Sequence, residues 1–162
     1  MKAVTVKQLK DELKHRSQVD MMELCLKLAR FKKENKELLT YLLFEADDED
    51  SYVQSVKDLV DDLFDQINTK SFFYIRKSIR KILSLTKKYI RYSKKKETEV
   101  ELLLHFCKRL IDFKPSISRS PRLTNVYITQ LRLAKKALTY LHEDLQYDYQ
   151  LELNELIGNE DE

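Results

Sequence analysis

The chain has 162 residues, enough for one domain with a hydrophobic core and no covalent cross-links. It contains one glycine and two prolines, where average composition would give roughly eleven and eight. Hairpins and phosphate-binding loops depend on glycine, so this composition excludes most β-rich and doubly wound folds. The net charge is +3 at pH 7. Cys25 and Cys107 lie in apolar runs, and we expect both to be free, buried thiols.

Apolar residues recur at steps of three and four along most of the chain, which predicts an all-α fold. The expected architecture is an irregular bundle or short stack of about seven antiparallel amphipathic helices in a single domain over residues 1–157. Residues 158–162 are predicted to be an acidic, disordered tail. The helices are expected at residues 5–16, 18–33, 36–46, 52–68, 72–93, 98–113 and 122–153.

Helix starts are marked by capping boxes, in which a Ser or Thr precedes a Glu or Gln by three residues. Such a pair satisfies two backbone amides that have no partner within the helix. The chain has three such pairs and one looser version with Asp, namely Thr5–Gln8, Ser51–Gln54, Thr98–Glu101 and Ser17–Asp20.

The segment 114–122 is the one long loop that the sequence indicates, because it holds both prolines and three serines. Pro121 is well placed to open the helix that follows, since its ring favours the first helical position. That last helix is unusually long, and we expect a bend or a break near residues 147–149.

The modest net charge hides a sharp division along the chain. Residues 45–65 contain nine acids and one base, whereas residues 70–96 contain eleven bases and no acid. On the helix at 72–93, at about 100° per residue, seven cations fall opposite the apolar stripe that begins at Ile75. We call these seven residues the basic face: Arg76, Lys77, Arg80, Lys81, Lys87, Lys88 and Arg91.

The helix at 52–68 carries four aspartates that are predicted to point outward, away from its apolar stripe. We call Asp58, Asp61, Asp62 and Asp65 the acidic ridge. If the two helices form a hairpin through their apolar sides, the two charged faces do not meet, and each stays available to a partner.

A solvated surface is the ordinary interpretation of a charged helix face. Two features of the basic face favour a binding role. It has no glutamate at i±4 that would form attractive pairs, and it has like charges at i,i+4, such as Arg76 with Arg80, which destabilise a helix unless an anion offsets them. Tyr74 and Tyr92 flank the face, where they could stack on unpaired bases, although packing at the edge of the core is the commoner role for such tyrosines.

The sequence shows no motif for catalysis, and we expect neither an enzyme nor a cofactor. His105 and Cys107 are two residues apart and point to different sides of a helix, so they cannot share a metal. The acidic run at 47–50 lacks the glycine and terminal glutamate of a calcium loop, which leaves no expected metal site.

No apolar run approaches about 18 residues and the first residues lack a signal-like apolar segment, so we expect a cytoplasmic location and no membrane partner. The function predicted first is a non-enzymatic helical interaction module that binds a partner protein, or itself, through its charged ridges. The alternative is a nucleic-acid-binding protein that uses the basic face of the helix at 72–93.

Overall fold

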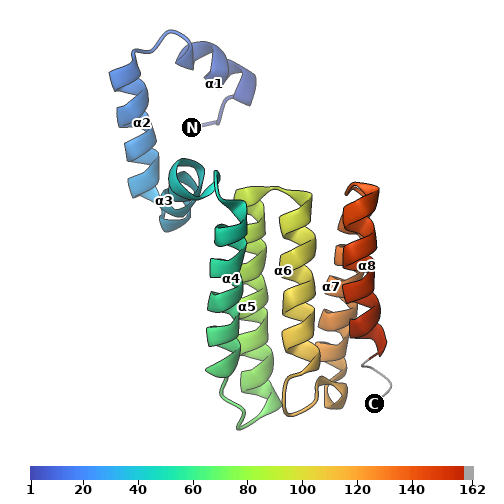
Figure 1. Ribbon diagram of the computed structural model, residues 1–162. Coiled ribbons are helices and arrows are strands. Elements are labelled where there is room, and N and C mark those ends of the chain that lie inside the picture. The colour runs from blue at the N-terminus through green and yellow to red at the C-terminus, as the bar shows by residue number, and fades with distance from the viewer. Residues whose placement is uncertain (159–162) are drawn as a thin grey trace. The chain divides into compact units, whose positions relative to one another are not determined.

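The computed structural model describes residues 1–158 and confirms the all-α fold (Figure 1). Over these residues the chain forms eight α-helices and no strand. The chain divides into two compact units, the first being Met1–Phe44 and the second starting at Glu45. The prediction of one helical domain over residues 1–157 did not include this division. Of the predicted acidic tail, Gly158 ends the last helix, and residues 159–162 lie outside the described part of the chain.

The first unit contains three short helices, and a turn of π-helix that begins in it ends at Glu45, the first residue of the second unit. Its two predicted caps are confirmed, because Thr5 with Gln8 and Ser17 with Asp20 both form capping boxes. Cys25 is exposed in this unit, so the prediction of two buried thiols is wrong for that residue. The elements are α1 (Val6–Leu13), α2 (Gln18–Phe31), α3 (Lys33–Thr40) and the π-helical turn (Tyr41–Glu45).

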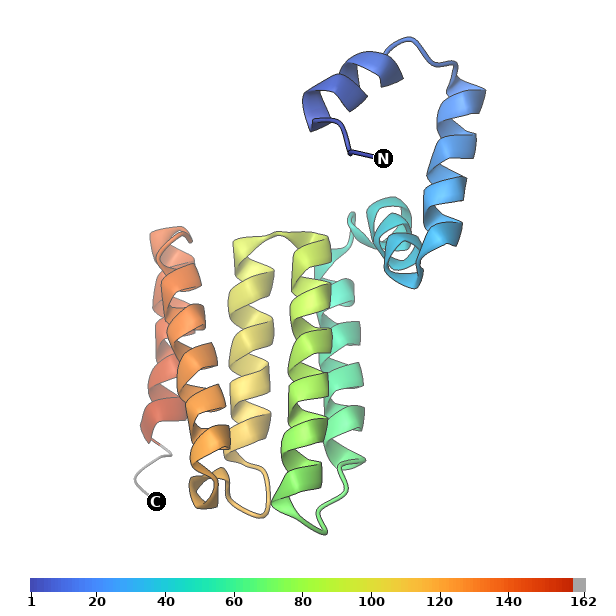
Figure 2. The same cartoon turned by 180° about the vertical axis from the view of Figure 1, so that it is seen from behind.

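The second unit is a bundle of five helices joined by short connections (Figures 1 and 2). The helix α6 is central, because α4, α5, α7 and α8 all pack against it. Its buried residues occupy about two-thirds of its circumference, as expected for a helix that packs against several neighbours. The bundle helices are α4 (Glu49–Asp65), α5 (Phe72–Ser93), α6 (Lys96–Ile111), α7 (Pro121–Leu138) and α8 (Glu143–Gly158).

Two predicted caps of the second unit are wrong. Helix α4 begins three residues before the predicted start, because the Asp48 side chain accepts a hydrogen bond from the Ser51 amide and caps the helix in its place. Helix α6 begins at Lys96, so Thr98 lies inside it. The Thr98 side chain is buried and donates a hydrogen bond to Glu49 Oε1 at 2.5 Å, which joins α6 to α4.

The long helix predicted at 122–153 is two helices, α7 and α8. Pro121 opens α7 as predicted, but the break lies at residues 139–142 and not near 147–149. Tight backbone bonds from Tyr140 to Ala137 and from Leu141 to Leu138 form the turn, and the Gln146 side chain donates to the Leu141 carbonyl at 2.7 Å. This turn lets α8 fold back against α6.

The contact between α8 and α6 includes polar groups as well as buried leucines. The Tyr149 hydroxyl lies 3.2 Å from Glu97 Oε1 and 3.4 Å from Glu101 Oε2. Half-buried Glu152 lies in the same region, and burial raises the pKa of its carboxyl group above the usual 4.5. The negative charge of Glu101 raises this pKa further, while Lys57 opposes the shift.

Because the folded chain holds the Glu152 proton more tightly than the unfolded chain, folding gains stability as the pH falls through the raised pKa toward 4.5. Above the raised pKa, the buried charge costs stability. We therefore expect Glu152→Gln to raise the thermal midpoint at pH 7.5 by about 1–3 °C and to leave it nearly unchanged at pH 4.5. Circular dichroism melts at the two pH values measure this, with the exposed Asp148→Asn as control. A variant that gains equally at both pH values would contradict the assignment.

Candidate interaction surface

The basic face of α5 lies where the sequence predicts it. Ile75, Ile79 and Ile82 are at most 3 % exposed and form the buried side of the helix. All seven cations lie outside this core. Four of them are exposed and three are half-buried, the exposed set being Lys77, Arg80, Lys81 and Arg91 and the half-buried set Arg76, Lys87 and Lys88.

Most of the basic face has no partner within the described residues. Lys88 is engaged, with its ammonium group 5.1 Å from the centre of the Tyr89 ring. Within residues 1–158, no ion pair or hydrogen bond engages the side chains of the other six cations, which are Arg76, Lys77, Arg80, Lys81, Lys87 and Arg91. Their mutual repulsion is therefore not offset by the described part of their own chain.

The two tyrosines proposed for base stacking differ in their surroundings. Tyr74 is 47 % exposed, and its ring packs edge-on against Phe73. Tyr92 is 9 % exposed and packs edge-on against Tyr89, with ring centres 5.8 Å apart. These two residues are i,i+3 neighbours on the helix, which brings their rings together. Tyr92 therefore packs at the edge of the core, the alternative that the sequence left open, whereas Tyr74 is accessible.

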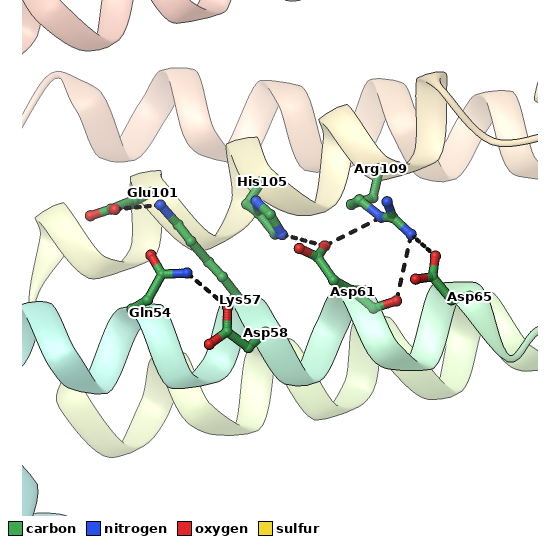
Figure 3. Close-up of polar contacts among 8 residues, drawn as sticks. All are labelled: Gln54, Lys57, Asp58, Asp61, Asp65, Glu101, His105 and Arg109. Atoms are coloured by element: carbon green, nitrogen blue, oxygen red, sulfur yellow. Dashed lines mark hydrogen bonds and ion pairs between the residues drawn. The ribbon is translucent and has the colours of Figure 1, made fainter.

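The acidic ridge is only partly free. Figure 3 shows Asp61 and Asp65 of α4 pointing toward side chains of α6. Asp61 Oδ1 lies 2.7 Å from His105 Nε2 and 3.3 Å from Arg109 Nε, and Arg109 also pairs with Asp65. The prediction of an outward, unpaired ridge is wrong for these two aspartates, because α6 packs against that side of α4.

The rest of the ridge keeps its outward orientation. Asp58 accepts a hydrogen bond from Gln54 of the same helix at 2.8 Å, and both residues are exposed. Asp62 is exposed, and its side chain makes no hydrogen bond or ion pair within residues 1–158. A further cross-helix pair joins Lys57 Nζ to Glu101 Oε1 at 2.5 Å (Figure 3). The polar contacts between α4 and α6 therefore fix how these two helices align.

We expect Asp61→Ala to lower the free energy of unfolding by about 1–2 kcal/mol, because it leaves the half-buried His105 and Arg109 side chains short of an acceptor. The neighbouring Asp62→Ala is the matched control and is expected to change stability by less than about 0.5 kcal/mol. Urea unfolding followed by circular dichroism compares the two. Equal stabilities would show that the cross-helix pairs do not hold α6 against α4.

The described residues offer no clear metal site, and one of the two thiols is shielded. Among residues 1–158, no three His, Cys, Asp or Glu side chains are grouped so that they could hold a metal ion. Within the acidic run, Glu49 bonds to Thr98 and pairs with Lys95, its carboxylate 3.1 Å from Nζ. Cys107 is fully buried, and burial raises the pKa of its thiol to about 12, which keeps it protonated and unreactive.

The exposed apolar side chains form a second surface that the sequence interpretation missed. Large apolar residues are exposed mainly in the first unit, although it has little more than a quarter of the chain. The signal was present in the segment 18–31, whose apolar residues are too widely spread around the helix for a single buried stripe. No helix in residues 1–158 combines the length and the apolar character needed to cross a bilayer.

Comparisons with protein-family models, with curated proteins and with solved structures give no match to this chain. Its function is therefore inferred from its own residues. The basic face of α5 is the surface with the clearest chemical preference, because its charge has one sign and few of its cations have partners in the described residues.

Proposed function

We propose that this protein is a non-enzymatic interaction module that binds an anionic partner along the basic face of α5. The observation that carries the proposal is the set of six cations on one helix face, which have no acidic partner within residues 1–158. A partner that supplies negative charge would relieve the repulsion between like charges at i,i+4 and gain from their complementarity.

An acidic surface on another protein fits this face best. The loss of Tyr92 as an exposed ring removes half of the stacking contribution that single-stranded nucleic acid would use. Pairing of the basic face with the acidic ridge of a second copy is weakened, because Asp61 and Asp65 already pair with α6. Binding of a separate acidic protein requires neither an exposed Tyr92 ring nor a free acidic ridge.

Nucleic acid is the second candidate, favoured by the length of the basic face. From Arg76 to Arg91 this face extends for about 23 Å, which matches a run of several phosphates. Exposed Tyr74 lies near its N-terminal end and could contact a base. About six neutralised phosphates would make the binding constant fall with salt at a log–log slope near −5.

The two candidates are tested by fluorescence anisotropy with the full chain and three labelled probes: poly-glutamate, 20-base-pair DNA and a 20-nucleotide RNA. Each titration is run at several NaCl concentrations between 50 and 300 mM. We expect poly-glutamate to bind at 50 mM NaCl, more tightly than either nucleic acid. Tighter nucleic-acid binding with a slope near −5 would replace the first candidate by the second. Absence of binding to all three probes at 100 μM protein would leave the basic face as a solvated surface.

We propose no catalytic activity and no cofactor, and we place the protein in the cytoplasm. Cys25 supports this location, because a free and exposed thiol is of the kind that persists in a reducing compartment. The buried thiol of Cys107 has no bearing on the location, because it is shielded from oxidants.

A further inference from the structure

The first unit exposes an unusual share of the apolar surface of the described chain. Fourteen of the twenty-one large apolar residues that are exposed lie in Met1–Phe44. None of the residues in α1, α2 or α3 is buried. Helices of this length are marginal in water unless an apolar face is packed against something. The exposed apolar surface of this unit therefore requires a packing partner.

The apolar arc of helix α2 shows where a packing partner is required. At about 100° per residue, its apolar side chains occupy about two-thirds of its circumference, whereas its charged residues fall within a sector of about 80°. The charged residues are Asp20, Glu23, Lys27 and Arg30. An apolar arc of this width needs neighbours on more than one side, since a single packed helix covers only a stripe.

Helix α3 covers only the middle of this arc. Asn35 of α3 donates a hydrogen bond to the Leu28 carbonyl at 2.8 Å, and Met21 and Ala29 are half-buried. Two flanks stay open on either side. The residues of the flanks are between 40 % and 77 % exposed; they are Val19, Met22 and Leu26 on one side and Leu24, Leu28 and Phe31 on the other.

We propose that a second copy of this chain covers the flanks, with the two α2–α3 hairpins packed antiparallel about a two-fold axis near Cys25. The order of residue types supports this partner, because it reads the same in both directions from Cys25. Apolar residues lie one, three, four and six positions away on each side, and charged residues two and five positions away. An antiparallel copy therefore places like residue types at equal heights along the two helices.

The charges support the antiparallel direction. The acids of α2 precede Cys25 and the bases follow it at the same spacings, so Asp20 mirrors Arg30 and Glu23 mirrors Lys27. An antiparallel pair brings the acidic half of each helix beside the basic half of the other, whereas a parallel pair brings like charges together. Opposite charges at the edge of an apolar contact favour one orientation over the other.

The flanks supply most of the apolar area that a stable dimer needs. At roughly 100 Å² for each exposed side chain, the six flank residues of α2 offer on the order of 600 Å² of apolar surface. A standard interface takes about 800 Å² from each partner, and two-fold homodimers are the commonest assemblies of this kind. Because little more than half of an interface is apolar, a second copy that covers most of the flanks would reach the usual size.

The first test is the mass of the full chain in solution, measured by sedimentation velocity at 5–100 μM. The chain has a mass of 19.4 kDa, and we expect about twice that value at both 50 mM and 1 M NaCl, because apolar contacts do not weaken with salt. A monomer at 100 μM would overturn the proposal. A dimer that dissociates at 1 M NaCl would also overturn it and would indicate contact through the charged ridges.

Substitutions on α2 test whether the contact lies there. Val19→Lys combined with Met22→Glu keeps the net charge and is expected to raise the dissociation constant at least 30-fold. Ile128→Asp, at an exposed position of α7, is the control and is expected to leave the dissociation constant unchanged. Glu23→Lys is expected to weaken the dimer, and addition of Lys27→Glu to restore it, because the mirrored charges are again opposite. If the second substitution restores the dimer, misfolding is excluded as the reason why Glu23→Lys weakens it. If none of these substitutions changes the dissociation constant of the dimer, the contact does not lie on α2.

Cross-linking through Cys25 tests whether the two-fold axis lies near this residue. Cys25 is exposed and Cys107 is fully buried, so a short bismaleimide is expected to join two copies through Cys25 alone. Cys25→Ser should abolish the cross-linked dimer and Cys107→Ser should not. Dimers in solution that resist this cross-linking would exclude an axis near Cys25. The inference does not depend on the basic face, because substitutions there are expected to leave the dimer intact.

Discussion

Phe106→Ala is expected to lower the free energy of unfolding of the five-helix unit by about 3–5 kcal/mol, the largest stability effect that we predict. Phe106 is fully buried at the middle of α6, the helix against which the other four pack. Its ring centre lies 5.7 Å from that of Phe64 on α4, so truncation removes an aromatic contact as well as buried area. Since small domains have a total stability of about 5–15 kcal/mol, the loss is a large fraction of it.

Thermal and urea unfolding measure this loss, which corresponds to a fall of roughly 10–25 °C in the thermal midpoint. Phe73→Ala is the matched control, because Phe73 has the same side chain and is 63 % exposed on α5. The control is expected to cost less than about 1 kcal/mol. A Phe106 variant as stable as the Phe73 variant would mean that α6 is not the centre of the bundle.

The fold class and α5 are the parts that the sequence predicted most closely. Helix α5 spans Phe72–Ser93, the predicted range, because its apolar stripe at Ile75, Ile79 and Ile82 has a single, unbroken register. The caps at Thr5 and Ser17 were also correct. A capping box is made within four residues, so the sequence alone contains all of its contacts.

The starts of α4 and α6 depend on contacts that the sequence does not reveal. Ser51 and Thr98 both begin plausible capping boxes, yet neither starts its helix. Asp48 is an equally good cap placed three residues earlier. The hydroxyl of Thr98 instead bonds to Glu49, which is 49 residues away, and such a distant partner cannot be inferred from a local pattern.

The charged surfaces also depend on contacts that the sequence does not reveal. The sequence placed the seven cations of the basic face outside the core of α5, and none of them is buried. Which neighbouring helix lies beside a charged residue depends on the packing of the bundle. The pairing of Asp61 with His105 therefore required the structure, as did the burial of Tyr92 beside Tyr89.

Replacement of three exposed cations on α5 by glutamate, Arg80→Glu, Lys81→Glu and Arg91→Glu, is expected to weaken binding of the anionic probe at least 100-fold. Each substitution reverses a charge that has no partner within residues 1–158. For a nucleic-acid probe, the loss of three phosphate contacts should also make the salt slope shallower by about 3. Anisotropy titrations at 50 mM NaCl measure the loss.

The same variant is expected to be about as stable as the natural chain, because the gain from new pairs along the helix offsets the loss of Arg91 from the last turn of α5. The new glutamates stand four residues after Arg76, Lys77 and Lys87, so three repulsive pairs become attractive ones. Each attractive pair contributes about 0.2–0.5 kcal/mol, and removal of each repulsion adds a similar amount. Lost binding together with unchanged or raised stability separates a binding face from a structural one, because damage to the fold would lower both.

The control for net charge carries Arg132→Glu, Lys135→Glu and Lys136→Glu on exposed positions of α7. It changes the total charge by the same amount as the α5 variant, so it reports the effect of a less basic protein without any change to α5. We expect it to bind within about threefold of the natural chain, because nonspecific attraction at a distance is screened beyond about 10 Å at 0.1 M salt. Equal losses in the two variants would mean that overall charge, and not the arrangement of cations along α5, attracts the probe.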